Sequence, residues 1–224
     1  MMKGAREVVV ADIDEGRVGF AVQKGFATGK YTVPMKRGKD VDENLQIARD
    51  TAEEVGKVVV GKDGKPLGMA DVVFECTGVQ ACVQAGIYVS NQSIYPSFAY
   101  FSVGGKQKLI SRQATTPGGR VMLVGMGNPI QTLALSAAAL REVDLVGVFR
   151  YNNTYEESIE LVSRKAKGDP DFSALVTHKF DGLENAVKGF EMAGKTKDEQ
   201  GNLVLKVVIQ TAAAAAEEQT NGHS

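Results

Sequence analysis

The chain has no tryptophan and only two cysteines among its 224 residues. Two thiols, Cys76 and Cys82, make no disulfide framework, and no secretory signal precedes them, so we expect free thiols. No run of 18 apolar residues is present, which excludes a predicted transmembrane helix. The formal net charge is −1, with acidic and basic side chains mixed along the chain. This balance provides no basic patch, so we expect a cytoplasmic protein without nucleic-acid or membrane partners.

Glycine is abundant, with 25 residues, and apolar side chains make up 43% of the chain. The apolar content is ordinary for a globular protein, and the glycines fit a fold with many strand-to-helix turns. A chain of 224 residues can hold one large domain, or one domain with a fragment of another.

Near-continuous apolar runs predict strands that are buried on both faces of a sheet. These runs occupy residues 8–12, 70–76, 120–126 and 145–149. Between them, apolar residues in 45–55 recur at spacings of three and four, which is typical of a helix packed by one face. The alternation of such strands and helices predicts an α/β fold with a parallel sheet.

Weaker signals predict further elements. Thr154 followed by Glu157 predicts a capping box for a helix that continues to Arg164. Residues 58–65 are rich in glycine and lysine and are expected to loop out, whereas 183–190 carry a helical apolar stripe. Three more short strands are predicted at 31–34, 175–180 and 203–209.

The run 8–12 ends in an acidic residue, Asp12, before a polar turn and an amphipathic segment. In a dinucleotide-binding sheet, the second strand ends in such an acid, which accepts hydrogen bonds from the adenosine ribose. A carboxylate here repels a 2′-phosphate and therefore favours NAD over NADP, with Arg17 as a second ribose contact. The alternative is that Asp12 only caps the following helix.

Six segments in this order resemble the second half of the sorbitol/xylitol-type polyol dehydrogenases, within the zinc-dependent medium-chain dehydrogenase/reductase superfamily. The resemblance extends from Gly4 to Ile209, and the segment at 139–151 is specific to the polyol branch. The six are Val-Val-Val-Ala-Asp-Ile-Asp at 8–14, Phe-Glu-Cys-Thr-Gly at 74–78, Gln-Ala-Gly-Ile-Tyr at 84–88, Gly-Gly-Arg-Val-Met-Leu-Val-Gly-Met-Gly at 118–127, Ala-Leu-Arg-Glu-Val-Asp-Leu-Val-Gly-Val-Phe-Arg-Tyr at 139–151 and Leu-Val-Thr-His-Lys-Phe at 175–180.

The resemblance implies an incomplete doubly wound, Rossmann-like parallel sheet that lacks its first strand, with a C-terminal remnant of the catalytic domain. It also implies hydride transfer between a polyol carbon and NAD, with zinc polarising the substrate oxygen. The full-length family forms homo-oligomers. The sequence does not choose among sorbitol, xylitol, galactitol and arabinitol.

Site residues are carried over by position. Asp12 and Arg17 would hold the adenosine ribose, and Gly125 would let the backbone approach the cofactor. Arg150 and Tyr151 would reach the substrate hydroxyls. The implied cofactor contacts, of which the last three would line the nicotinamide, are Asp12, Arg17, Val124, Gly125, Met126, Val148, Phe149 and Arg150. The alternatives are strand packing for the two valines and a salt bridge or interface contact for Arg150.

The sequence departs from the family at its front. The phosphate-binding Gly-x-Gly-x-x-Gly loop should precede residue 8, and Gly125-x-Gly127 does not replace it because a third glycine is missing. The zinc ligands of the family have no counterpart, and neither His178 nor His223 has a metal-ligand spacing to a cysteine. We therefore assign no catalytic residue and no metal site, and we interpret His178 as a structural strand residue.

The missing strand is central in a doubly wound sheet. Strands 8–12 and 70–75 would each lose a neighbour and leave main-chain groups unpaired. We expect the two strands to pair directly with one another in a domain of low stability. With the zinc site and the phosphate loop missing, we expect the chain alone to have little or no activity.

A second departure lies at 89–113, where the family runs directly from Gly-Ile-Tyr into Ala-Thr-x-Pro-Gly-Gly. The inserted residues have neither periodicity nor turn signals, which is unusual inside a compact domain. Our hypothesis is a translated intron, because Val-Ser and Gln at its ends can be encoded by splice-donor and splice-acceptor sequences. The alternative is a genuine surface insertion, and sequencing of the mature transcript separates the two.

The resulting domain plan has three parts. Residues 1–165 are predicted to form the dinucleotide-binding domain, with an incomplete N-terminus. Residues 166–210 are the segment that packs with the catalytic domain in the family, and 211–224 form a disordered, alanine-rich tail. The alternatives to an enzyme of this family are a non-catalytic module that associates through its sheet edge and a mispredicted gene product.

Overall fold

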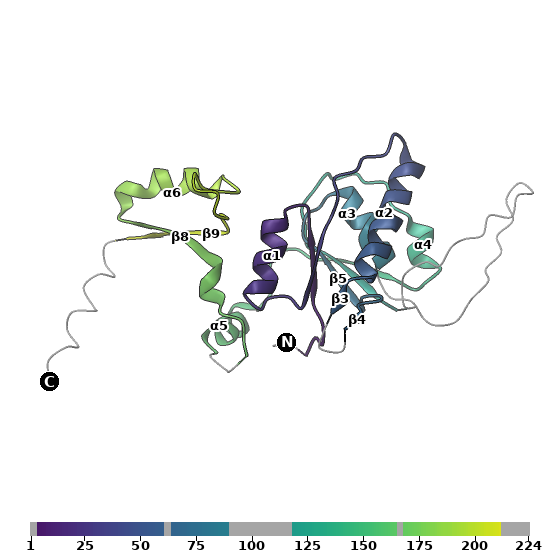
Figure 1. Cartoon of the computed structure of the whole chain (residues 1–224), viewed down its shortest axis with the longest axis horizontal. Helices are drawn as coiled ribbons and strands as arrows, with labels where there is room; N and C mark the ends of the chain where they lie inside the picture. The colour runs from purple at the N-terminus through teal and green to yellow at the C-terminus, as the bar shows by residue number, and fades with distance from the viewer. Residues whose placement is uncertain (1–3, 61–63, 90–117, 165–167, 212–224) are drawn as a thin grey trace, which may run out of the picture.

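The computed structural model of the chain describes residues 4–60, 64–89, 118–164 and 168–211 (Figure 1). The predicted insertion, apart from Val89, and the predicted tail beyond Thr211 lie outside these residues. The described part has an α/β architecture in which all the longer strands pair in parallel, as predicted. None of its helices has the length and apolar character needed to cross a lipid bilayer.

The first unit is a strand, a helix and a second strand. β1 (Val9–Asp12) pairs in parallel with β2 (Gly29–Thr32), and α1 (Glu15–Gln23) connects them. β-branched residues favour the extended β1, and Asp14 begins the helix as its N-cap. Val18 is fully buried and anchors α1.

The second unit is a three-stranded parallel sheet in the order β5-β6-β7. Its strands are β5 (Val72–Glu75), β6 (Arg120–Leu123) and β7 (Asp144–Gly147). The helices around it are α2 (Val41–Gly56), α3 (Gln80–Val89), α4 (Leu135–Ala139) and α5 (Tyr155–Ser163). The three strands, α2 and α5 begin and end within four residues of their predicted limits.

Two adjoining clusters form the core of this unit. The first lies between α3 and the sheet, where Ile87 and Val121 are fully buried. The second lies between α2 and α3, where Ala48 and Ala52 leave room for the ring of Tyr88. Small residues on one helix therefore face a large residue on the other, which allows the two helices to approach closely.

The predicted direct pairing of strands 8–12 and 70–75 is wrong. In the described residues, β1 belongs to a two-stranded sheet with β2, and β5 belongs to the separate β5-β6-β7 sheet. Side-chain packing differs for the two strands: Val73 of β5 packs against the cluster of Ile87 and Val121, whereas Val58 and Val60 lie against Gly29 of β2. The prediction that the sheet is buried on both faces is also wrong at β5, because the Phe74 side chain is 67% exposed.

Two local predictions also need correction. Residues 58–65 do not simply loop out, because β3 (Val59–Val60) pairs antiparallel with β4 (Lys65–Pro66). The apolar run that begins this segment buries Val60, which favours a strand. Thr154 is the N-cap of α5, but its side chain makes no capping hydrogen bond. Its ψ of −2° is helical, whereas a capping side chain needs an extended backbone.

The C-terminal unit is a smaller layer of one helix on two parallel strands. β8 (Val176–Asp181) pairs with β9 (Lys206–Gln210), and α6 (Ala186–Ala193) packs on them through Gly189. The 3₁₀ turns η1 (Phe172–Leu175) and η2 (Leu183–Asn185) precede β8 and α6. Figure 1 shows this unit at one end of the molecule, beside α1.

Candidate nucleotide-binding site

Asp12 lies at the carboxyl end of β1, and two groups of the following turn donate to its carboxylate. The backbone N–H of Asp14 lies 2.9 Å from Oδ1, and Nη1 of Arg17 lies 3.1 Å from Oδ2. The Asp12 side chain remains 25% exposed. The predicted pair of Asp12 and Arg17 is therefore in direct contact, with part of the carboxylate open to solvent.

The helix cap is a different residue. Asp14 has the extended backbone of an N-cap, and its Oδ1 accepts the backbone N–H of Arg17 at 3.0 Å. This hydrogen bond lowers the pKa of Asp14, and the nearby Lys197 ammonium adds to the effect. The alternative in which Asp12 caps α1 is thus wrong, and Asp12 is left free of that role.

Glu15 joins the start of α1 to β2. Its two carboxylate oxygens accept hydrogen bonds from Lys30 and Thr32, both on β2. The hydrogen bond from Lys30 lowers the pKa of Glu15, and the Thr32 hydroxyl lowers it further. The start of α1 is therefore joined to β2 by polar contacts on the exposed side of the unit.

A second group of candidate residues lies where β6 and β7 end. Leu123 and Gly147 are partners in the parallel register, so Val124 and Val148 continue the two strands side by side. The Val148 N–H donates to the Leu123 carbonyl at 3.1 Å. Two segments of predicted residues thus leave neighbouring strand ends, Val124, Gly125 and Met126 after β6 and Val148, Phe149 and Arg150 after β7.

Gly125 is confined by the loop that follows β5. A Cβ atom built on Gly125 would lie 2.0 Å from the backbone nitrogen of Gly78, and one on Gly127 would lie 1.7 Å from the Gly78 carbonyl oxygen. Two backbone segments are therefore in direct contact at the carboxyl ends of β5 and β6. This contact requires glycine at residue 125 whether or not a cofactor approaches it.

Glu75 organises that loop, although it was not among the site residues predicted from the sequence. Glu75 is 4% exposed, and its carboxylate accepts hydrogen bonds from the backbone N–H groups of Thr77 and Gly78 and from the Thr77 hydroxyl. Its main-chain oxygen accepts the N–H groups of Val124 and Gly125, each at 2.8 Å. Glu75 could have been predicted from the signal that was used for Asp12, which is an acidic residue at the end of an apolar strand.

The two residues predicted to contact substrate lie just beyond β7. The guanidinium carbon of Arg150 lies 5.5 Å above the ring centroid of Phe149, and both side chains are exposed. Arg150 has a φ of +56°, which turns the chain toward α5. Tyr151 and Tyr155 meet edge to face at 4.6 Å, and their hydrogen bond raises the pKa of Tyr155.

The sequence of the chain is similar to those of known dehydrogenases. Sorbitol dehydrogenase from Homo sapiens is 34% identical over 208 residues, which is 92% of this chain. Sorbitol dehydrogenase from Gallus gallus is 34% identical over 190 residues, or 85% of this chain. The chain is a homologue of the sorbitol dehydrogenases. The chain covers only 43% of the human protein and 40% of the chicken protein. No protein-family model matches it.

Solved structures of two dehydrogenases share the fold of the chain. An oxidoreductase of unknown specificity from Escherichia coli is 25% identical with a TM-score of 0.56, over 93% of this chain and 45% of that one. L-Idonate 5-dehydrogenase from Escherichia coli is 18% identical with a TM-score of 0.54, over 92% and 44% of the two chains. The second likeness concerns the fold alone. The predicted resemblance and fold class are therefore confirmed.

The described residues of this sorbitol dehydrogenase homologue do not fit the zinc ion that the resemblance implies. No group of three or more histidine, cysteine, aspartate or glutamate side chains converges in that part of the chain. Both ring nitrogens of His178 are engaged, Nδ1 with the Thr177 hydroxyl at 3.0 Å and Nε2 with the Asp198 carboxylate at 3.3 Å. His223 lies outside the described residues.

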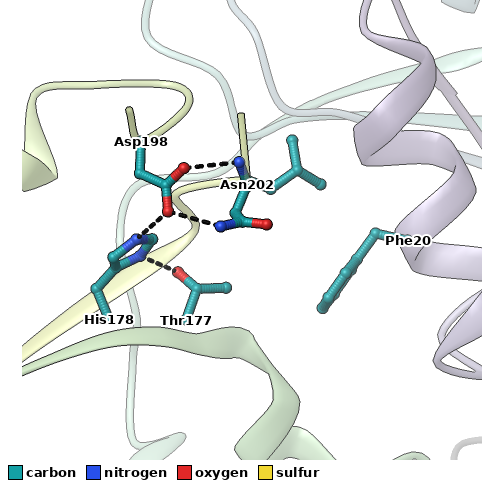
Figure 2. Close-up of a pocket in the computed structure, with 6 residues that line it drawn as sticks. Phe20, Thr177, His178, Asp198 and Asn202 are labelled. Atoms are coloured by element: carbon teal, nitrogen blue, oxygen red, sulfur yellow. Dashed lines mark hydrogen bonds and ion pairs between the residues drawn. The ribbon is translucent and has the colours of Figure 1, made fainter. Parts of the chain in front are cut away.

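A pocket of about 330 Å³ lies beside His178, between the C-terminal unit and α1 (Figure 2). Phe20 of α1 forms one wall, and Thr177, His178 and Asn202 lie on the opposite side. The polar groups on that side are largely bonded to one another, as the dashed lines of Figure 2 show. The pocket therefore separates α1 from the C-terminal unit and offers few free polar groups.

Proposed function

We propose that the chain binds the adenosine half of NAD through Asp12 and Arg17, as part of an NAD-dependent polyol dehydrogenase. The observation that supports this most strongly is the Asp12–Arg17 pair at the carboxyl end of β1. Ligands of open parallel sheets bind beyond the carboxyl ends of the strands. In the complete reaction NAD accepts a hydride from a polyol carbon.

The carboxylate of Asp12 has the hydrogen-bonding capacity that this role needs. Its two oxygens offer about four acceptor positions, and two are taken by Asp14 N–H and Arg17. The remaining positions can accept the 2′- and 3′-hydroxyls of a ribose. A 2′-phosphate would instead meet a negative charge, so NAD is the favoured cofactor over NADP.

The ends of β6 and β7 suit the other end of the cofactor. We assign Val124, Gly125 and Met126, together with Val148 and Phe149, to the nicotinamide side. Arg150 is exposed beside them and, with Tyr151, would contact the hydroxyl groups of a small polyol. These assignments place the dinucleotide-binding domain within residues 1–165. Residues 166–210 form the C-terminal segment that packs with the catalytic domain in the family.

No step is derived through zinc, because the described residues provide no ligand set for it. For the same reason we assign no catalytic residue, and we expect the purified 224-residue chain to give no measurable oxidation of sorbitol or xylitol with NAD. Turnover in an NADH absorbance assay would contradict this expectation.

Calorimetric titration with ADP-ribose tests the proposal directly, because this probe carries the ribose without the nicotinamide. We expect the unmodified chain to bind it, and Asp12→Asn to weaken binding about tenfold or more, since charge-assisted hydrogen bonds are lost. Asp50→Asn, on the exposed face of α2, is the matched control and should leave the affinity unchanged.

The comparison with 2′-phospho-ADP-ribose provides the second arm of this experiment. The unmodified chain should prefer ADP-ribose, and Asp12→Asn should reduce that preference. Absence of ADP-ribose binding, or equal affinities for the chain and for Asp12→Asn, would overturn the proposal.

A second candidate function is association through the sheet edge, which would also support a homo-oligomer. In the described residues β7 pairs only with β6, so its other edge is open. Unpaired strand edges are templates for pairing with another chain. Multi-angle light scattering should then give a mass above 23.9 kDa that falls on dilution. A monomer at all concentrations would remove this candidate.

A further inference from the structure

The loop between α6 and β9 contacts the first turn of α1. Nζ of Lys197 lies 3.8 Å from Oδ2 of Asp14, the N-cap of that helix. One Cδ atom of Leu203 lies 3.4 Å from the position that a Cβ would have on Gly16. The C-terminal unit therefore contacts the start of α1 at Asp14 and at Gly16, next to Arg17.

Asp198 gives this loop a defined shape. Its Oδ1 accepts the backbone N–H groups of Gln200 and Asn202 at 3.0 and 2.7 Å. Its Oδ2 accepts the Asn202 side-chain amide at 2.9 Å and lies 3.3 Å from Nε2 of His178. Lys197 and Leu203 form an antiparallel bridge across the loop. The two residues that touch α1 thus pair across a loop whose interior is held by the Asp198 carboxylate.

Elsewhere, α1 and the C-terminal unit are largely apart. The pocket of about 330 Å³ lies between Phe20, on the second turn of α1, and the wall formed by β8 and the loop. A further contact follows α1, where the rings of Phe26 and Phe172 lie 5.7 Å apart. The start of α1 is therefore located by Lys197 and Leu203, and the segment after its end by Phe172.

We propose that Lys197 and Leu203 position the first turn of α1, so that the C-terminal unit sets the affinity of the Asp12–Arg17 site. The inference rests on the proposed function, because it assigns the turn a nucleotide to bind. The path is short: Lys197 contacts Asp14, Asp14 accepts the Arg17 N–H, and Arg17 donates to Asp12.

The contact of Lys197 is suited to positioning more than to stability. The Lys197 side chain is 51% exposed and the Asp14 side chain 20% exposed. Exposed ion pairs of this kind contribute little to the free energy of unfolding. Removing the charge should therefore change the placement of the turn while leaving the fold intact.

Binding of ADP-ribose to single and double variants tests the proposal. Lys197→Met should weaken binding about two- to fivefold, the range expected for an exposed ion pair, with an unchanged melting temperature. Lys197→Arg should restore the affinity. Lys195→Met, two residues away and exposed, is the matched control and should bind like the unmodified chain.

Asp14→Asn completes a double-mutant cycle, because asparagine still caps the helix but does not pair with Lys197. The double variant should bind no more weakly than Asp14→Asn alone. Additive losses in the double variant, or no rescue by Lys197→Arg, would overturn the proposal.

Amide hydrogen exchange provides a readout that needs no nucleotide. The Arg17 N–H should exchange faster in Lys197→Met than in Lys195→Met, while amides of α2 stay unchanged. If the unmodified chain does not bind ADP-ribose, the proposed function fails and the exchange rates still decide the role of Lys197. Equal exchange at Arg17 in the two variants would show that Lys197 does not position the turn.

Discussion

The backbone of Gly125 lies directly against that of Gly78, so that the loops after β6 and β5 touch without intervening side chains. Glu75 holds the arrangement, since its main-chain oxygen accepts the Gly125 N–H and its carboxylate accepts the Gly78 N–H. The candidate nicotinamide side of the site is therefore built on a contact between two loops. Its geometry depends on the absence of side chains at both glycines.

Gly125→Ala is expected to destabilise the chain. The added Cβ would lie 2.0 Å from the Gly78 nitrogen, and relief of such overpacking costs about 1–3 kcal/mol. Gly147→Ala is the control, because nothing lies within 4 Å of its Cβ position. Urea unfolding followed by circular dichroism measures both. Equal midpoints for the two variants would contradict the contact.

Arg17→Met should weaken ADP-ribose binding without unfolding the chain. Arg17 contributes one hydrogen bond to Asp12 at 3.1 Å and is partly exposed, so a loss of about two- to fivefold in affinity is expected. Arg17→Lys keeps the charge and should retain part of the affinity. Calorimetry gives the affinities, and thermal melting checks the fold. A loss of melting cooperativity in Arg17→Met would indicate a structural role instead.

The stability of the C-terminal unit should depend on the ionisation of Asp198. The Asn202 side-chain amide, followed by other donors that include His178, lowers the pKa of Asp198 below its ordinary 3.8. A carboxyl group with a lowered pKa stabilises the folded state above the unfolded-state value, and the contribution is lost as the pH falls through the folded-state value. The melting temperature should therefore fall as the pH decreases below about 3.8.

Asn202→Ala tests the cause of this dependence. The variant should melt below the unmodified chain near neutral pH, and the difference should narrow as Asp198 becomes protonated at low pH. A difference that is constant from about pH 6 to pH 2.5 would show that the Asn202 amide does not act through the Asp198 charge.

Tyr88→Phe is expected to stabilise the core by about 1 kcal/mol. The Tyr88 side chain is 1% exposed, and its buried hydroxyl has no hydrogen-bond partner in the described part of the chain. Phenylalanine keeps the ring beneath Arg49, whose guanidinium carbon lies 5.2 Å from its centroid. Ile87→Val, at the neighbouring buried position, should lose about 0.5–1.5 kcal/mol. A loss in Tyr88→Phe of the same size would reveal a partner for the hydroxyl.

The sequence predicted local structure well where one feature decides it. The runs at 120–126 and 145–149 form β6 and β7, and the helical stripe in 45–55 forms part of α2. Asp12 and Arg17 were each predicted as contacts of the adenosine ribose, but the hydrogen bond between them was found only in the structure. The resemblance to the family, which rests on six segments in the same order, also pointed to Asp12 and Arg17.

Predictions failed where a long-range contact competes with a local signal. Asp12 and Glu75 both end apolar strands, yet one carboxylate is partly open and the other is buried under its own loop. The pairing of β1 with β5 was predicted from unsatisfied main-chain groups. Instead, β5 packs through Val73 against Ile87 and Val121, and Val60 lies against Gly29, the first residue of the strand that pairs with β1.

The sequence by itself determined the α/β alternation, the parallel strands and the kinship with the sorbitol dehydrogenases, because periodicity and ordered motifs are properties of neighbouring residues. Only the tertiary structure decided which acid caps α1, why residue 125 is glycine, and that Lys197 meets Asp14. The last two depend on groups that the fold brings together from distant parts of the chain. The first depends on the backbone conformation of the turn between β1 and α1. Packing and hydrogen-bond geometry, which no spacing in the sequence encodes, select among the alternatives.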